Sequence, residues 1–142
     1  MAGTTVSYWE DNISVTLATV TNYIHYALIN LGVNDVTAGL PDETTWKANY
    51  QTIIDAFKAD WPGIKVYITK PWKRGFDTEV TALAGWIDDL VAANAGVCFV
   101  ADNESTWLKG ADDGVTMTTD GVHYSVAGNA EKINQMITVF GY

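Results

Sequence analysis

The segment Asp120-Gly121-Val122-His123 has a spacing that could do chemistry. An aspartate three residues before a histidine can curl back and accept the proton on Nδ1 of the imidazole. The other ring nitrogen, Nε2, is then free to act as a general base, as in acyl-transfer triads. The same spacing also fits a surface turn with a solvated histidine, so further signals in the chain must decide between the two.

A second pattern, Gly32-Val33-Asn34-Asp35, follows an apolar run. An asparagine amide at the exit of a buried strand can direct two N–H donors into a cleft without adding charge, which suits a developing oxyanion. Alternatively, Asn34 and Asp35 only form a turn, because both side chains can bond their own backbone. The two interpretations are balanced when this segment is taken alone.

Helices and strands that would position these residues alternate along the chain. Helices are predicted from about Tyr8 to Thr21 behind a capping box of Ser7 and Glu10, from Asp42 to Trp61, between a cap at Asp77 and an end at Gly96, and after a cap at Ser125. Short apolar runs predict strands at His25 to Gly32, Ile64 to Thr69 and Val97 to Ala101, the first of them buried on both faces.

This alternation predicts an α/β fold with a parallel sheet covered by helices on both faces. Ligands bind to such sheets at the carboxyl ends of the strands. Asn34 and the Lys70 to Arg74 segment follow two of these ends. The connection from Asp102 to Val122 follows the third, and its length favours a functional loop.

Taken in order, a Gly-x-Asn-Asp block after an apolar strand and a later Asp-x-x-His before a helix resemble the SGNH/GDSL hydrolase family. The resemblance implies a three-layer α/β/α, flavodoxin-like fold and hydrolysis of carboxylic esters, with a short acyl ester or an acylated carbohydrate as substrate. It also implies that Asn34 is an oxyanion donor and that Asp120 and His123 are the acid–base pair. Gly3, just ahead of the first helix, matches the family's oxyanion glycine.

The sequence departs from the family in its nucleophile, because no Gly-Asp-Ser occurs anywhere in the chain. Ser7 and Ser125 are predicted helix caps, and Ser14 is a mid-helix residue. Ser105, in the long loop, is the one serine weighed as a substitute nucleophile. Residues 1–142 therefore resemble a single SGNH hydrolase-like domain that lacks its first two strands and the serine between them.

Without those strands, the His25 to Gly32 strand would lie at the edge of the sheet. An exposed apolar edge invites pairing with another chain. We therefore expect a homodimer through this strand, or binding of a separate N-terminal fragment.

The composition excludes other classes of protein. Seventeen acidic and eight basic side chains give a formal charge of −9, which disfavours nucleic acid and anionic membranes as partners. No signal peptide or membrane-spanning run is visible, so the chain is predicted to be soluble, and its location in the cell stays open. Cys98, in an apolar run, is predicted to be a buried hydrophobe.

Three further features of the sequence are weaker indications of a binding site. Lys70 to Arg74 is a basic cluster that could receive a carbohydrate or an acidic substrate, or is a solvated loop around a packed Trp72. Trp107 is the tryptophan expected to line a cleft. The acidic side chains of the long loop lack the spacing of a calcium loop, so no metal or other cofactor is predicted.

The sequence thus predicts an ester hydrolase domain that keeps its oxyanion residues and Asp-His pair but lacks a nucleophilic serine, and that is weakly active or inactive alone. The alternative is a non-catalytic binding or assembly protein with a remnant hydrolase fold.

Overall fold

Three parallel strands form the middle layer of the molecule. The computed structural model describes residues 4–110 and 112–141. Its strands are β1 (Tyr26–Ile29), β2 (Lys65–Lys70) and β3 (Cys98–Asn103), paired in the order β1-β2-β3. Val66 of β2 lies between Ala27 of β1 and Cys98 of β3, which fixes the register of the sheet.

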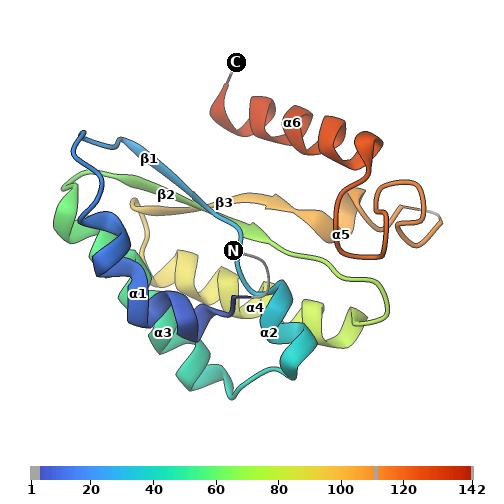
Figure 1. The fold of residues 1–142 in the computed structure, drawn as a ribbon, viewed down its shortest axis with the longest axis horizontal. Helices are drawn as coiled ribbons and strands as arrows, with labels where there is room; N and C mark the ends of the chain where they lie inside the picture. Colours follow the sequence, from blue (N-terminus) through green and yellow to red (C-terminus); the bar gives the residue numbers. More distant parts are fainter. Residues whose placement is uncertain (1–3, 111, 142) are drawn as a thin grey trace.

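Helices cover both faces of this sheet (Figure 1). One face carries α1 (Val6–Leu17), α2 (Val33–Ala38), α3 (Glu43–Asp60) and α4 (Asp77–Ala93), and the other carries α6 (Val126–Phe140). The short helix α5 (Glu104–Trp107) follows β3 directly. Among the described residues, none of these helices has the length and apolar composition needed to cross a membrane. The predicted three-layer α/β fold with a parallel sheet is confirmed.

The core lies between the sheet and the α3–α4 side. Trp46, Tyr50 and Ile54 of α3 are fully buried, as the helical spacing of these residues predicts. Leu83 and Ile87 of α4 are equally inaccessible. Cys98 is buried as predicted, and burial raises the pKa of its thiol to about 11, so the thiol stays protonated and unreactive at neutral pH.

Two predicted helix starts are corrected. Helix α1 begins at Val6, and its cap is Thr5, whose side chain accepts the Tyr8 N–H, so the predicted capping box at Ser7 is wrong. Helix α4 begins at Asp77 after Phe76, and the Asp77 carboxylate accepts from Lys109 (2.6 Å) instead of capping the helix. The predicted cap at Ser125 is confirmed, since its Oγ accepts the Gly128 N–H (3.1 Å).

The predicted strand at His25 to Gly32 is shorter than expected and is not buried on both faces. Ala27 and Ile29 face the core, whereas Tyr26 and Leu28 are 60% and 46% exposed. β1 is the outer strand of the sheet, and on its second face Tyr26 meets the Phe140 ring of α6 (6.2 Å between ring centroids) but stays largely exposed. Composition alone did not distinguish an edge strand from an interior one.

Candidate functional site

Asp120 and His123 form a close pair in an exposed turn before α6. Asp120 Oδ2 lies 2.7 Å from Nδ1 of His123, and Oδ1 accepts the backbone N–H groups of His123 (2.8 Å) and Val122 (3.0 Å). The His123 backbone N–H, helped by its imidazole, holds the pKa of Asp120 well below its usual range. The carboxylate is therefore ionised at neutral pH and occupies Nδ1, which leaves Nε2 for a proton transfer.

The turn is attached to the loop that follows β2. Arg74 donates its backbone N–H to the Gly121 carbonyl (3.0 Å) and its Nε–H to the Asp113 carbonyl (2.7 Å). Gly121 has a φ of +89°, and a Cβ there would lie 2.9 Å from Cβ of Arg74. The glycine in Asp-Gly-Val-His is thus required both by its left-handed backbone and by the close approach of Arg74.

Asn34 and Asp35 lie in α2 and hold the start of α1. Asn34 Nδ2 donates to the Thr4 carbonyl (2.9 Å), while both carboxylate oxygens of Asp35 accept from the Val6 N–H (3.3 and 3.2 Å). Asp35 is 4% exposed, and burial raises the pKa of its carboxyl against the opposing effect of the Val6 N–H. The alternative of a simple Asn-Asp turn is wrong, because the segment is helical. Gly3, the predicted oxyanion glycine, lies outside the described residues.

Gly32 makes the entry into α2 possible. It has a φ of +115°, and a Cβ there would lie 2.6 Å from a methyl group of Leu83 and 3.5 Å from Pro71. No other residue type would fit this position without strain. The glycine of the Gly-x-Asn-Asp pattern therefore places Asn34 directly at the end of β1.

The Asn34 helix and the His123 turn lie at the same end of the sheet. Pro71 packs against Gly32, and the Lys73 ammonium donates to the Thr37 hydroxyl of α2, so the loop after β2 contacts α2. The next residue of the same loop, Arg74, binds the His123 turn. At the end of β1, Asn30 Nδ2 also lies 3.2 Å from the hydroxyl of Tyr124, the residue after His123.

A buried polar cluster under this end of the sheet was not predicted. Glu104, 3% exposed, accepts the Trp72 N–H (3.1 Å), the Asn30 amide (3.2 Å) and the Tyr124 hydroxyl. It thereby joins the ends of all three strands to the residue next to His123. Lys132 of α6 supplies the positive charge.

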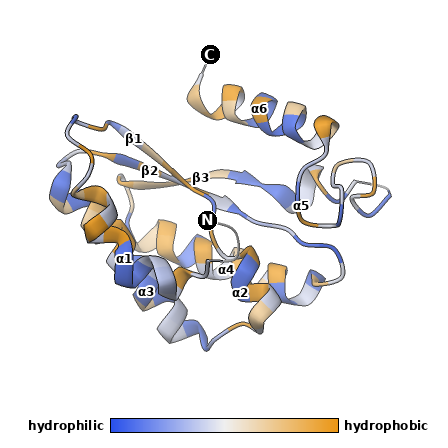
Figure 2. Ribbon diagram, in the orientation of Figure 1, coloured by the Kyte–Doolittle hydropathy of each residue, from blue (hydrophilic) through white to orange (hydrophobic). Residues whose placement is uncertain are grey.

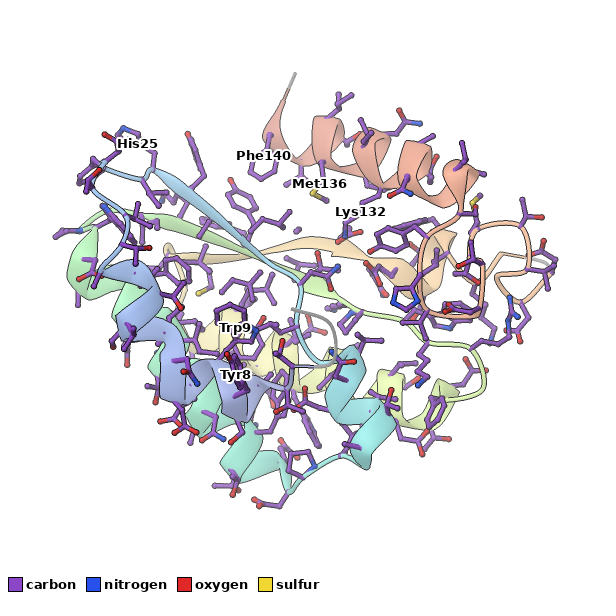
Figure 3. The ribbon with its side chains drawn as sticks, in the orientation of Figure 1. Tyr8, Trp9, His25, Lys132, Met136 and Phe140 are labelled. Atoms are coloured by element: carbon purple, nitrogen blue, oxygen red, sulfur yellow. The ribbon has the colours of Figure 1, made fainter. Side chains whose placement is uncertain are left out.

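Lys132 points from α6 toward the sheet (Figure 3). Its ammonium lies 2.9 Å from Asp102 and 3.2 Å from Glu104, and donates to the Thr69 hydroxyl (3.1 Å). Burial raises the pKa of Glu104, whereas Lys132 lowers it. The sequence offered one hint of this cluster, the polar residues at the last positions of otherwise apolar strands, but it did not connect them to Lys132.

The other predicted features have structural partners. Lys70 pairs with Asp88 (2.7 Å), and Trp72 is buried, so the basic cluster is largely engaged within the chain. Trp107 donates to Asp102 (3.2 Å), and its ring lies 5.9 Å from that of Tyr124, beside the His123 turn. Within residues 4–110 and 112–141, no three His, Cys, Asp or Glu side chains gather as a metal site.

None of the four serines lies in a contact with the Asp120–His123 pair. Ser7 and Ser14 are in α1, and Ser105 is in α5, where its backbone N–H donates to Asn103. The Ser125 hydroxyl donates to the Thr116 carbonyl (2.7 Å) while capping α6.

The sequence and the fold were compared with those of known proteins. The model of the GDSL-like Lipase/Acylhydrolase family matches residues 1–131. A carbohydrate esterase of family 3 from Talaromyces cellulolyticus superposes with a TM-score of 0.80 at 20% identity, over 98% of this chain and 68% of the other. A serine-to-alanine variant of an acetyl esterase, crystallised with an acetate ion, gives the same values. A GDSL-like lipase from Bacteroides thetaiotaomicron gives a TM-score of 0.74 at 21% identity, over 96% of this chain and 70% of the other. No curated protein matches the sequence.

Proposed function

Because the chain belongs to the GDSL-like lipase/acylhydrolase family, we propose that it acts on carboxylic ester bonds with His123 as the general base, Asp120 as its partner and Asn34 as an oxyanion donor. The observation that carries the proposal is the 2.7 Å contact between Asp120 and His123 at the same end of the sheet as Asn34. Gly3 is proposed as a second oxyanion donor, through its backbone N–H.

Each group has one task in this mechanism. His123 Nε2 takes the proton from the attacking O–H as that oxygen bonds to the carbonyl carbon. The carbonyl oxygen becomes an oxyanion, and Asn34 donates to it; one N–H of Nδ2 is used by Thr4, and the other remains for the substrate. When the C–O bond of the ester breaks, the leaving alkoxide takes the proton from His123. Asp120 keeps the imidazole in the required tautomer throughout.

The attacking group comes from outside the four serines of this chain. Their positions in α1, in α5 and at the cap of α6 give none of them a hydrogen bond to His123. We therefore propose that a second polypeptide supplies the serine for full activity, and that the chain alone turns over esters slowly with water as the attacker.

A short acyl ester, such as an acetylated carbohydrate, is the proposed substrate class. Support comes from the carbohydrate esterase and the acetate-bound acetyl esterase, whose folds the chain shares. Trp107 and Tyr124, packed together beside the His123 turn, offer aromatic surface on which a sugar ring could lie.

Hydrolysis of p-nitrophenyl acetate tests the proposal. We expect His123→Ala to lower the enzyme-dependent rate by about 10²–10⁴-fold, the usual contribution of a general base. The chain contains one other histidine, His25, and His25→Ala is the matched control that should leave the rate unchanged.

Absence of turnover in the wild type, or equal rates for both histidine variants, would contradict the proposal. That result would favour the second candidate function, a non-catalytic assembly protein. The open edge of β1 is the observation that favours this alternative.

A further inference from the structure

Two segments of the chain carry no charged side chain. Residues 12–34 and 133–141 contain no Asp, Glu, Lys or Arg, so all 17 acidic and all 8 basic residues lie elsewhere. The first segment includes the second half of α1, the following loop and β1, and the second is the end of α6. Such a gap is unusual in a chain with a net charge of −9, and depletion of charge is a property of interface cores.

Apolar side chains are exposed on these same segments. Tyr26 and Leu28 of β1 are 60% and 46% exposed, and Ile133 and Ile137 of α6 are 60% and 42% exposed. Hydrophobic residues occur along the length of α6 (Figure 2), although it is Lys132, Met136 and Phe140 that point toward the sheet (Figure 3). The two uncharged segments meet where the Tyr26 and Phe140 rings pack together (6.2 Å between ring centroids), and both expose apolar side chains.

A groove runs along the other side of the edge, between α1 and β1. It has a volume of about 220 Å³, and its walls include Trp9 and Ile13 of α1, Leu28 of β1 and Phe57 of α3. The outer backbone groups of β1 have no strand beside them in the described sheet. Unpaired backbone groups flanked by apolar side chains form a site for strand addition.

We propose that this uncharged surface is a homodimer interface, in which β1 pairs antiparallel with β1 of a second copy to form a continuous sheet. A two-fold interface brings the same surface of both copies together. Two bodies of charge −9 repel each other through any acidic surface, and the surface of residues 12–34 and 133–141 is the one that avoids this repulsion.

The alternation of β1 sets the register. Directly opposed residues of an antiparallel pair point to the same face, so the two-fold axis must pass at a residue and not between two residues. If the axis passes at Ala27, Tyr26 of each copy lies opposite Leu28 of the other copy. The exposed side chains then form two aromatic–aliphatic pairs across the interface. The interface does not include Asp120 or His123, so its test is separate from that of the slow hydrolysis by the chain alone. A serine-bearing fragment that replaced the missing strands would compete with the second copy for this edge.

Sedimentation equilibrium of the wild type, Leu28→Lys and Val115→Lys tests the interface. We expect the wild type to be dimeric at about 100 μM and Leu28→Lys to weaken association by about 100-fold or more, because two buried ammonium groups would then face a sheet seam. Val115, 63% exposed in the loop before the His123 turn, gives the matched control, and Val115→Lys should remain dimeric. Circular dichroism checks that each variant is folded, and Tyr26→Lys replaces Leu28→Lys if the latter is not.

A wild type that stays monomeric at this concentration overturns the proposal, and so does a dimer that the folded β1 variant leaves intact. A monomer that instead forms a one-to-one complex with a separate N-terminal fragment also overturns it, and assigns the same surface to that fragment.

Discussion

Asp35 and Asp120 are two aspartates that flank the same end of the sheet in opposite surroundings. Asp35 is 4% exposed and takes its hydrogen bonds from the backbone of α1, and burial raises the pKa of its carboxyl. The side chain of Asp120 is 51% exposed and pairs with His123, whose N–H groups lower the pKa of its carboxyl. The first carboxylate holds two helices together, whereas the second orients the imidazole that we propose as the general base.

The difference shows that burial and chemistry are separated in this molecule. Two of the buried carboxylates, Asp35 and Glu104, connect elements of the fold, and the pKa of each is raised. Asp120 and His123, the proposed acid–base pair, lie in an exposed turn that backbone hydrogen bonds hold in position. Perturbed pKa values alone would therefore have pointed to structural residues as well as to the proposed site.

The largest difference between the two aspartates is expected in kcat when each is replaced by asparagine. Asp120→Asn removes the charge that holds the tautomer of His123, so kcat for p-nitrophenyl acetate should fall by about 10²-fold or more with little change in KM. Asp35→Asn should lower kcat far less. Equal losses in the two variants would mean that Asp120 also acts through the fold.

A smaller effect concerns how the exposed turn is held. A Cβ at Gly128 of α6 would lie 2.1 Å from the Met117 carbonyl, whereas a Cβ at Gly85 of α4 would meet nothing within 4 Å. Gly128→Ala should lower the free energy of unfolding by about 1–3 kcal/mol through overpacking. Gly85→Ala, the control, should raise it by about 0.5–1 kcal/mol. Urea unfolding measures both, and a neutral Gly128→Ala would show that α6 does not fix the loop before the turn.

The pH dependence of stability gives a third contrast. A raised folded-state pKa means that stability is lost as the pH rises through it, so the wild type should lose stability relative to Asp35→Asn as the pH rises above about 4, the usual range of an aspartate. A lowered pKa acts in the opposite sense, so the wild type should gain stability relative to Asp120→Asn as the pH rises from about 2 to 5. Urea midpoints at several pH values measure both slopes. Slopes of the same sign would remove the distinction between the two carboxylates.

No change at all is expected at Ser105. Its place in α5 gives it no contact with the His123 turn, so Ser105→Ala should hydrolyse p-nitrophenyl acetate at the wild-type rate. Intact-mass analysis after treatment with an organophosphonate should show no adduct on the wild type. A stable adduct that Ser105→Ala abolishes would move the nucleophile into this chain.

Most of the fold could be predicted from patterns of residues that are close together in the sequence. The alternation of helices and strands, the helical spacing of Trp46, Tyr50 and Ile54, and the contact between Asp120 and His123 depend on residues close in sequence, and each was predictable. The errors arise where distant residues decide. Thr5, and not Ser7, caps the start of α1. At this start Asp35, which lies 29 residues away in the sequence, accepts the Val6 N–H.

The buried polar cluster around Glu104 and Lys132 could not be predicted for the same reason, because its residues are far apart in the sequence. Glu104 and Lys132 meet across 28 positions, and Asn30 reaches Glu104 across 74. No spacing rule connects such residues, because only the parallel order of the strands brings their ends together. The edge position of β1, in contrast, was predicted by comparison with the family that the chain resembles, and the strand order confirms it.

The central claim is that Asn34 and His123 face one acyl group, and a titration with acetate monitored by NMR tests it directly. Acetate has the shape of the acyl product, and it is bound in the acetyl esterase that shares this fold. We predict that the side-chain amide of Asn34 and the imidazole of His123 shift together along one binding curve, while the His25 imidazole stays unchanged. Shifts at only one of the two residues, or shifts at His25 of equal size, would contradict a shared site.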